Sequence, residues 1–402
     1  MKYKNFNAIV NEYNTDNFIS FLQKNIIRKR RRNQTLSKLS VVIPSYGRQD
    51  FIIRQCAYWH GRGASVVIID GSPKPIVYEI QKIMDGLSDI TYIHSTALLV
   101  DRLAHAATLI KTPYSVLCGD DEFLLETGLC SAISLLEREK DLVACIGQSI
   151  NYYLTNNGLK CSYGTNYLNN NYKYDIRHDD FQERLYASVK NYNSATCYAV
   201  TRSPVWCKSW GNVKQTSSGD IIEFEHALTT YIWGKLASVD DVYWMRSVEN
   251  PPAETDDVKR LPAEEWWTSN KFKTERENFV TKLGQEITSV HQMDRIKAEA
   301  LIRDVFDFYL QEEKYLINIS FRRKYRQLTL NILKNLLPQW LVLFVTRYVR
   351  RVRTIRPFKG NFGTLDDLKS VNTPVPFLLS GELVAELSCM ENLIADFYKA
   401  RS

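Results

Sequence analysis

The chain has 402 residues, of which 45% are hydrophobic and 24% are charged, and its formal net charge is +7. This length predicts one large domain with appendages or two domains, and the composition excludes wholesale disorder. No segment approaches the roughly 20 apolar residues that cross a bilayer, and no apolar signal peptide begins the chain, so we expect a cytoplasmic protein. The eight cysteines lack the spacing of a structural zinc site and are typical of buried thiols in a reducing compartment.

The N-terminal segment, residues 1–38, predicts a basic helix. Apolar residues recur at helical spacing from Asn17 onward, and the run Arg28–Arg32 closes the segment with positive charge. We expect this helix to precede the first strand.

Strand and helix patterns alternate from residue 39 to about residue 150. Short apolar runs closed by turn residues predict buried strands, and apolar residues at helical spacing predict the helices between them. The predicted strands are 39–44, 65–69, 90–94, 114–118 and 142–146, and the predicted helices are 48–60, 76–84, 98–110 and 129–139. This alternation predicts an α/β fold with a mostly parallel, Rossmann-like sheet.

The rest of the chain is less regular at first and helical later. Residues 151–191 are rich in Tyr and Asn and predict an irregular insertion. The helical patterns that follow are 221–233, 293–309 and 327–350. We therefore divide the chain into the basic segment 1–38, the α/β domain 39–265 and a helical C-terminal region 266–402.

Polar and acidic residues follow three of the predicted strands, in the segments 44–48, 70–72 and 119–122. The carboxyl ends of parallel strands meet at one edge of a sheet, where α/β proteins bind ligands. Adjacent carboxylates such as Asp120 and Asp121 are costly after a buried strand unless a cation neutralises them, so they predict a Mg²⁺ or Mn²⁺ site. The alternative is that these two residues only open a turn.

Two other residues at this edge have two interpretations each. Asp70 either accepts a hydrogen bond from a base or a ribose, or it is a turn residue before Gly71. Arg48 either pairs with a phosphate through its guanidinium, or it is a solvated residue at a helix start.

Three strings resemble family 2 type bacterial glycosyltransferases with the GT-A fold. They are Val41–Tyr46 (VVIPSY), Val67–Ser72 (VIIDGS) and Thr112–Phe123 (TPYSVLCGDDEF), and the last is similar to the branch whose metal loop reads TPY followed by GDDxF. The resemblance covers residues 39–250. It departs from the family at Cys118, which stands where the family has the first aspartate of its D-x-D motif.

The resemblance implies a nucleotide-diphosphate sugar across the strand ends. The base would lie near Pro44, Tyr46 and Asp70, with Arg48 nearby. The diphosphate would be bound through a metal at Asp120, with Asp121 beside it and water in place of the missing acid.

The resemblance also implies inversion by a general base on a helix that ends in glycine. The residue at that spacing from Gly234 is Glu223, with Asp220 and Glu225 as alternatives. A partly desolvated carboxylate with a raised pKa suits removal of a proton from an acceptor hydroxyl, whereas an acid that only stabilises the helix start fits Asp220 better. The histidines predict no role, and the group Trp206, Trp210, Trp233 and Trp244 predicts core packing more than an acceptor platform.

Residues 336–356 combine an apolar stretch with a run of arginines. This layout suits docking on a membrane surface, and it equally suits a core helix with a solvated basic end.

These observations predict a metal-dependent glycosyltransferase of bacterial surface polysaccharide synthesis. It would transfer a sugar to a polysaccharide or lipid-linked glycan, in the cytoplasm or peripherally on the inner face of the plasma membrane. No G-x-G-x-x-G string follows Ile43, which argues against a dinucleotide oxidoreductase. The alternatives are a nucleic-acid-binding protein that uses the basic runs, which we do not expect, and a catalytically degenerate scaffold.

Overall fold

The computed structural model describes residues 14–27, 32–155, 158–163, 174–190, 192–248, 250, 261–336, 363–365 and 380–401. The strands are β1 (Leu39–Ser45), β2 (Ser65–Asp70), β3 (Ile90–His94), β4 (Tyr114–Leu117), β5 (Phe123–Leu124), β6 (Leu142–Thr155), β7 (Gly158–Tyr163), β8 (Val200–Arg202), β9 (Lys235–Ser247) and β10 (Gly363–Thr364). The first α-helices are α1 (Thr15–Ile26), α2 (Gln49–Trp59), α3 (Tyr78–Asp85), α4 (Leu99–Leu109), α5 (Glu126–Arg138) and α6 (Phe181–Lys190). The later ones are α7 (Ser203–Ser209), α8 (Gly219–Trp233), α9 (Ala263–Thr268), α10 (Lys273–His291), α11 (Arg295–Leu336) and α14 (Gly381–Arg401), with short 3-10 helices at Leu36–Lys38, Ser194–Tyr198 and Asn270–Phe272.

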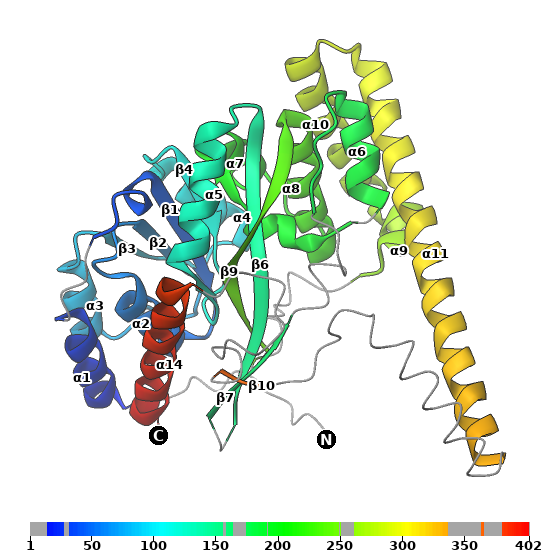
Figure 1. Cartoon of the computed structure of the whole chain (residues 1–402). Helices are drawn as coiled ribbons and strands as arrows, with labels where there is room; N and C mark the ends of the chain where they lie inside the picture. The colour runs from blue at the N-terminus through cyan, green and yellow to red at the C-terminus, as the bar shows by residue number, and fades with distance from the viewer. Residues whose placement is uncertain are drawn as a thin grey trace.

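The strands form one mixed sheet in the order β10-β7-β6-β8-β4-β1-β2-β3, and β9 pairs with β6 and β5 (Figure 1). The strands β4, β1, β2 and β3 are parallel to their neighbours within this group. Their carboxyl ends therefore lie at one edge of the sheet, as the alternation in the sequence predicts.

The central strands are buried on both faces. Successive residues of β1 belong to different hydrophobic clusters: Val41 and Ile43 pack into the larger cluster, and Val42 packs into the smaller one. Helices α2, α3 and α5 contact the sheet on the side of the larger cluster, and α4 and α7 contact the strands on the side of the smaller one; α8 contributes residues to both clusters. The continuous apolar strands of the sequence are thus the middle layer of a three-layer α/β structure.

The predicted fold class is confirmed: an α/β sheet domain is followed by a helical C-terminal region. Among the details that differ from the sequence-based prediction, two concern the long strands of the sheet. In the segment 151–191, β6 continues to Thr155, β7 pairs with it, and α6 follows, because β6 extends along β7 and β9 beyond the apolar run that marks its start. The strand β9 was not predicted, since Asp240 and Asp241 interrupt its apolar pattern where its pairing with β6 shifts register.

The two ends of the described chain pack together on the sheet domain. Helix α14 lies beside α1 and α2, although it is the last helix in the sequence (Figure 1). The ring of Phe397 contacts the rings of Phe18, Phe21 and Phe51 at centroid distances of 5.8, 6.1 and 5.2 Å. The proposed division at residues 39 and 265 remains a prediction, but α14 contributes to the core of the sheet domain.

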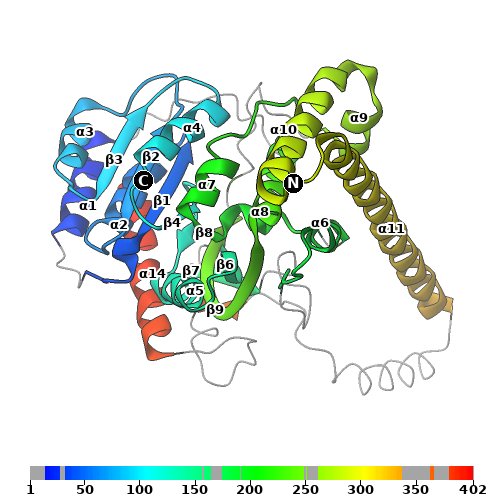
Figure 2. The same ribbon diagram turned by 90° about the horizontal axis from the view of Figure 1, so that it is seen from above.

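The helical region between them packs through α10 and α11. Helix α10 contacts α8, and α11 contacts α6 and α10. Aromatic rings fill this interface, with Phe306 lying 5.3 Å from Phe224 and 4.0 Å from Trp267 between ring centroids. Figures 1 and 2 both show α11 extending well beyond the sheet domain.

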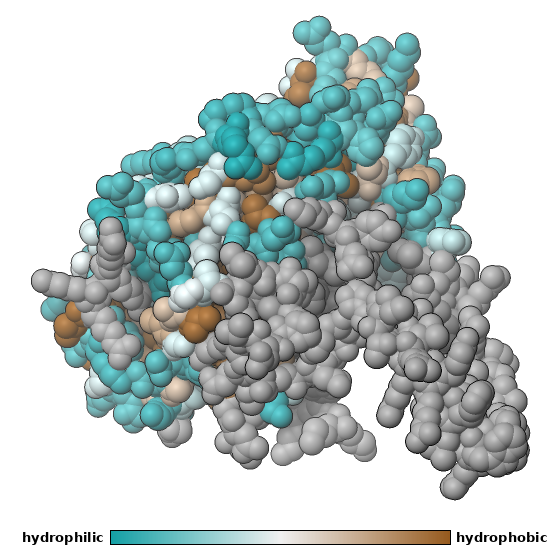
Figure 3. Space-filling view, viewed as in Figure 1, coloured by the Kyte–Doolittle hydropathy of each residue, from teal (hydrophilic) through white to brown (hydrophobic). Residues whose placement is uncertain are grey.

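The face shown in Figure 3 has hydrophilic residues interspersed with smaller hydrophobic groups. Among the described residues, no helix combines the length and the apolar character that crossing a membrane requires. The basic runs from the sequence lie mostly outside the described part of the chain, which lacks residues 28–31 and 337–356. The membrane and nucleic-acid hypotheses for those runs therefore stay predictions.

Glu386 on α14 is the polar contact that should matter most for holding the C-terminal helix in place. Its side chain is buried, accepts hydrogen bonds from the backbone N–H groups of Glu126 (2.5 Å) and Thr127 (3.2 Å), and lies 3.5 Å from the guanidinium of Arg62. Glu386→Ala would leave these helix-start donors without their partner, and Arg62 would keep Glu126, 3.3 Å away, as its carboxylate partner. We expect the free energy of unfolding to fall by about 2–4 kcal/mol in urea denaturation.

Glu382→Ala is the matched control, because Glu382 is an exposed glutamate on the same helix. It should cost less than about 1 kcal/mol. Equal losses for the two variants would contradict the importance assigned to the Glu386 contacts.

Candidate active site

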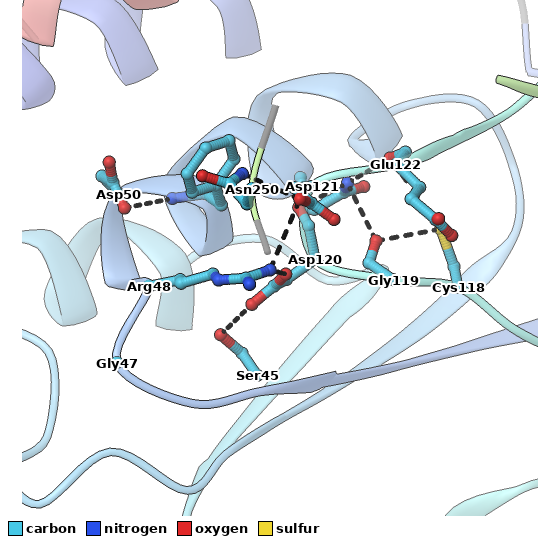
Figure 4. A network of polar contacts seen from close by, with 12 residues as sticks. Ser45, Gly47, Arg48, Asp50, Cys118, Gly119, Asp120, Asp121, Glu122 and Asn250 are labelled. Carbon is cyan, nitrogen blue, oxygen red and sulfur yellow. Dashed lines mark hydrogen bonds and ion pairs between the residues drawn. The ribbon is translucent and has the colours of Figure 1, made fainter. Parts of the chain in front are cut away.

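The turn after β1 directs Arg48 toward the acidic loop that follows β4. Gly47 has a φ of 67°, a left-handed conformation that glycine adopts without strain. Its N–H donates a 3.0 Å hydrogen bond to Ser72 Oγ in the loop after β2. Arg48 then starts α2, and Figure 4 shows its side chain reaching Asp120.

Asp120 and Asp121 are surrounded by donors from two other parts of the chain (Figure 4). Ser45 Oγ donates to Asp120 Oδ2 at 2.7 Å, and Arg48 Nη1 donates to Asp120 Oδ1 at 3.1 Å. The same Arg48 nitrogen lies 3.4 Å from Asp121 Oδ2, which also accepts a 2.8 Å hydrogen bond from Asn250 Nδ2. The predicted metal pair and the predicted phosphate-binding arginine are therefore in direct contact.

The backbone of the acidic loop is held from two sides. Gln55 Nε2 on α2 donates to the carbonyl oxygens of Asp120 (2.9 Å) and Glu122 (2.6 Å). Tyr152 Oη on β6 donates to the carbonyl oxygen of Asp121 at 2.6 Å. These bonds satisfy carbonyl groups at the buried start of the loop and fix the direction of its carboxylates.

Burial raises the pKa of two carboxyl groups in this loop. Burial first, and the charge of Asp121 second, raise the pKa of Asp120 to about 6, while Arg48 and Ser45 favour its charged form. Burial and Asp121 raise the pKa of Glu122 to about 8, against the hydrogen bond that Trp244 Nε1 donates to it at 2.9 Å. Burial disfavours the charged form of Arg48, but Asp120 and Asp121 outweigh it and raise the pKa of the guanidinium.

Asp70 lies one strand away, opposite Ser45 in the pairing of β1 with β2. Its side chain is fully buried and accepts hydrogen bonds at both oxygens. Oδ1 accepts from the N–H (2.9 Å) and Oγ (2.5 Å) of Ser72, and Oδ2 accepts from Gln49 Nε2 and Tyr92 Oη, both at 2.9 Å. A base or ribose that binds Asp70 would have to replace Gln49 or Tyr92.

Arg102 on α4 joins the ends of β1 and β2. Its Nη1 donates to the carbonyl oxygens of Ser45 (2.8 Å) and Ile69 (3.0 Å). A Cβ atom at position 71 would lie 2.4 Å from Arg102 Cζ, so Gly71 is required for this close approach. Burial lowers the pKa of Arg102, although the nearby Asp70 partly opposes this effect.

The other two residues predicted near the base are less deeply buried. Pro44 is half-buried near the end of β1, and the ring of Tyr46, 41% exposed, follows it. An exposed aromatic ring in the turn after β1 is a suitable stacking surface for a base.

The acidic pair has the ligands for a cation with a partly open coordination shell. Asp120 and Asp121 offer carboxylate oxygens, and the described residues contain no group of three or more His, Cys, Asp or Glu side chains that could hold a metal ion. Burial and Glu122 raise the pKa of Cys118 well above its ordinary value, so a neutral thiol stands where the resemblance expects an acid. Mg²⁺ is commonly held by one or two carboxylates with water and substrate phosphates, and the pair fits that pattern. Arg48 already provides one positive charge there.

Glu223 lies in the second turn of α8 and is half-buried. Its carbonyl oxygen accepts a weak hydrogen bond from Cys197 Sγ at 3.9 Å, and its charge contributes to the raised pKa values of Tyr192 and Cys197, after burial. These contacts place Glu223 beside the segment 192–197. Its role as the base stays a prediction.

The two alternative bases differ in environment. Asp220 is exposed in the first turn of α8. Glu225 is buried and forms an ion pair with Lys282 on α10, and burial raises the pKa of Glu225 despite that pair. Glu225 is therefore the least suited of the three to meet an acceptor, because a buried, paired carboxylate is not exposed to substrate.

Aromatic residues considered as an acceptor platform are mostly in the core. Trp206, Trp210 and Trp244 are buried, and Trp233 is half-buried. His226 stacks on Trp210 at 4.3 Å, and burial lowers its pKa to about 3, so this histidine is neutral and structural.

The sequence-based prediction missed several residues that build this site. Ser45 lies within the VVIPSY string, and its position between Pro44 and Tyr46 was the available signal. Asn250 follows β9, a strand that the sequence did not predict. The sequence therefore offered no reason to expect Asn250 at this edge of the sheet. Gln55 and Tyr152 act through their side chains on backbone carbonyls, a contact that leaves no motif in the sequence.

No protein-family model matches the chain, and no curated protein matches it. Among solved structures, the chain is similar to residues 1–349 of S. aureus TarS with a TM-score of 0.38 and 11% identity, covering 71% of this chain and 91% of that one. For the same fragment in complex with UDP-GlcNAc, the TM-score is 0.39 and the identity 11%, with 71% and 92% covered. The function proposed below therefore depends on the residues of this chain and their contacts.

The raised pKa of Glu122 predicts a pH-dependent stability. The group binds its proton more tightly in the folded than in the unfolded chain, so the free energy of unfolding should fall as pH rises from the ordinary value of 4.5 through about 8. Glu122→Gln has no proton to lose and keeps an oxygen for Trp244. In urea denaturation the variant should match the wild type near pH 4 and exceed it by up to about 5 kcal/mol near pH 9.

Glu137→Gln is the control, because Glu137 is a more exposed glutamate on α5 that pairs with Lys38. It should leave the slope of stability against pH unchanged. A Glu122→Gln profile parallel to that of the wild type would contradict the raised pKa.

Proposed function

We propose that the chain is a glycosyltransferase that moves a sugar from a nucleotide-diphosphate donor to a polysaccharide or lipid-linked glycan. The observation that carries this proposal is the convergence of Asp70, Arg48 and the Asp120-Asp121 pair at the carboxyl edge of one parallel set of strands. A buried acceptor, a guanidinium and a cation-binding pair are the groups that a base or ribose and a diphosphate require. Two of the strings of the GT-A resemblance carry Asp70 and the Asp120-Asp121 pair, and Arg48 lies two residues after the string VVIPSY.

Each group has a distinct task in donor binding. The Tyr46 ring would stack on the base, and the Asp70 carboxylate would accept a donor of the base or ribose after Gln49 or Tyr92 moves away. Asp120 and Asp121 would hold a Mn²⁺ or Mg²⁺ ion, which supplies charge neutralisation to the diphosphate when bound. Arg48 adds a fork of donors that matches phosphate oxygens.

The acceptor side is assigned to the first turns of α8. Glu223 is the proposed base that takes the proton of the acceptor hydroxyl, with inversion at the anomeric carbon. Its half-buried position suits a carboxylate that must be both reactive and reachable. Asp220 is the alternative, since its exposure also lets it meet an acceptor.

The biological setting belongs to the same proposal. The acceptor would be part of a bacterial surface polysaccharide, and the protein would act in the cytoplasm or on the inner face of the plasma membrane through residues 336–356. Docking there would place a soluble donor and a lipid-linked acceptor at one site.

The donor assignment predicts that a nucleoside diphosphate stabilises the folded protein only when the acidic pair is intact. In a thermal-shift screen of UDP, GDP, CMP and dTDP with Mn²⁺, one nucleotide at about 100 times its Kd should add about 2.7 kcal/mol and raise Tm by a few degrees. Asp120→Ala should abolish both this shift and sugar transfer. The variant should stay folded, because Arg48 keeps Asp121 as its partner.

Asp141→Ala is the control, since Asp141 is an exposed aspartate paired with Lys235. It should keep both the shift and the activity. An Asp120→Ala enzyme with normal transfer would overturn the metal assignment, and no shift with any nucleotide in the wild type would favour a catalytically degenerate scaffold.

The base assignment predicts different losses for neighbouring carboxylates. Glu223→Gln should lower kcat by at least about 100-fold with little change in the KM for the donor, because general base catalysis typically contributes a factor of this size. Asp220→Asn should retain most of the activity. The reverse ranking would move the base to Asp220 and leave the rest of the proposal in place.

A further inference from the structure

We propose that Arg48 is the resident counter-ion of Asp120 and Asp121, and that it moves to the donor diphosphate when a divalent cation binds the pair. This inference rests on the proposed function, because it describes how the same site passes from its free to its loaded state.

The geometry shows one positive group shared by two carboxylates. Arg48 Nη1 lies 3.1 Å from Asp120 Oδ1 and 3.4 Å from Asp121 Oδ2. The three side chains are largely buried, with exposed fractions of 18% for Arg48, 7% for Asp120 and 13% for Asp121. At such short distances between largely buried charges, the guanidinium strongly favours the charged forms of both carboxylates.

A divalent ion at the same oxygens would be incompatible with Arg48 in this position. Mg²⁺ binds carboxylate oxygens at about 2.1 Å, so an ion ligated by Asp120 Oδ1 would lie within a few ångströms of the guanidinium. Like charges at this separation repel as strongly as the present pair attracts. The other contacts of the pair come from the neutral donors Ser45 and Asn250, which a metal ion does not repel.

The start of α2 allows Arg48 to move. Gly47 precedes it, and no heavy atom lies within 4 Å of the place where a Cβ of residue 47 would be. Tyr46 and Gly47 are both exposed, and the turn that carries Arg48 is held to the loop after β2 by the hydrogen bond from the Gly47 N–H to Ser72 Oγ. A rotation of the long side chain suffices to transfer the guanidinium from carboxylate to phosphate oxygens, which it recognises with the same fork of donors.

Two consequences follow from this exchange. A metal ion alone must displace Arg48 and therefore binds the free protein weakly. A diphosphate offers the displaced guanidinium a new partner, so metal and diphosphate should each strengthen the binding of the other.

The test is the affinity of the full chain for Mn²⁺ without nucleotide, measured by the loss of the free-ion signal in electron paramagnetic resonance. Arg48→Gln removes the charge but keeps a hydrogen-bond donor for Asp120. It should bind Mn²⁺ at least about tenfold more tightly than the wild type. Arg48→Lys keeps the charge and should bind Mn²⁺ less tightly than Arg48→Gln does.

The matched control is Arg177→Gln, because Arg177 also pairs with two carboxylates, those of Glu139 and Asp175. It should leave the affinity for Mn²⁺ unchanged. Mn²⁺ binding by Arg48→Gln that is equal to or weaker than that of the wild type overturns the exchange. Mn²⁺ binding that survives Asp120→Asn with Asp121→Asn would instead overturn the metal site of the proposed function, which is a separate failure.

A second measurement uses the wild type and does not depend on whether Arg48→Gln folds. The side-chain Nε–H resonance of Arg48, assigned by its absence from Arg48→Lys, is followed by NMR during titration with Mg²⁺ and then inorganic pyrophosphate. We expect the signal to shift when the ion binds and to shift again with pyrophosphate. A signal that stays unchanged while Mg²⁺ saturates the pair overturns the exchange.

Discussion

The ion pairs between Arg48 and the carboxylates of Asp120 and Asp121 are the contacts on which the rest of the site depends. Two adjacent carboxylates at the buried end of a strand repel each other and lose hydration, so both effects disfavour their charged forms. The structure offsets this cost with one guanidinium, with the hydroxyl of Ser45 and with the amide of Asn250. These donors come from the turn after β1 and from the segment after β9, so the acidic loop holds together parts of the chain that are far apart in sequence.

Residues of the sheet and of the helices that pack on it also hold the acidic loop and the neighbouring strand ends in position. Arg102 ties the ends of β1 and β2 together through backbone carbonyls, which fixes the separation between the Asp70 and Asp120 regions. On the opposite side of the sheet, the buried guanidinium of Arg54 lies over the rings of Phe51, Phe123 and Phe397, which belong to α2, β5 and α14. The strand that carries Phe123 begins directly after Glu122. Helix α14 therefore contacts, through Arg54, the strand that follows the acidic loop.

Burial and local partners give different pKa values to acidic residues that look alike in the sequence. Asp120 and Glu122 are both acids of one short loop, yet their pKa values are raised to about 6 and about 8, because Glu122 has Trp244 as a neutral donor while Asp120 has the charge of Arg48. Glu225 and His226 are neighbours on α8 and both are buried. Glu225 forms an ion pair with Lys282, whereas burial lowers the pKa of His226 and keeps its ring neutral. Asp220 and Glu223 are the acids of α8 that remain exposed or half-buried.

Local patterns in the sequence were enough to establish the α/β class, most strands and helices of residues 39–146, and the placement of Arg48, Asp70, Asp120 and Asp121 at one edge. The physical reason is that continuous apolar runs and helical spacing can be read from neighbouring residues in the sequence. Parallel strands then bring the residues that follow each strand to the same edge of the sheet, whatever the details of packing. The sequence did not reveal β9, β7 or the role of Asn250, since Asp240 and Asp241 interrupt the pattern at a register shift and the pairing partner β6 is about 100 residues away. Only the tertiary structure decided that Arg48 neutralises the acidic pair, that Glu225 is paired with Lys282, and that α14 packs on the sheet domain. Each of these contacts joins segments that are far apart in the sequence, and no local pattern shows that they meet in space.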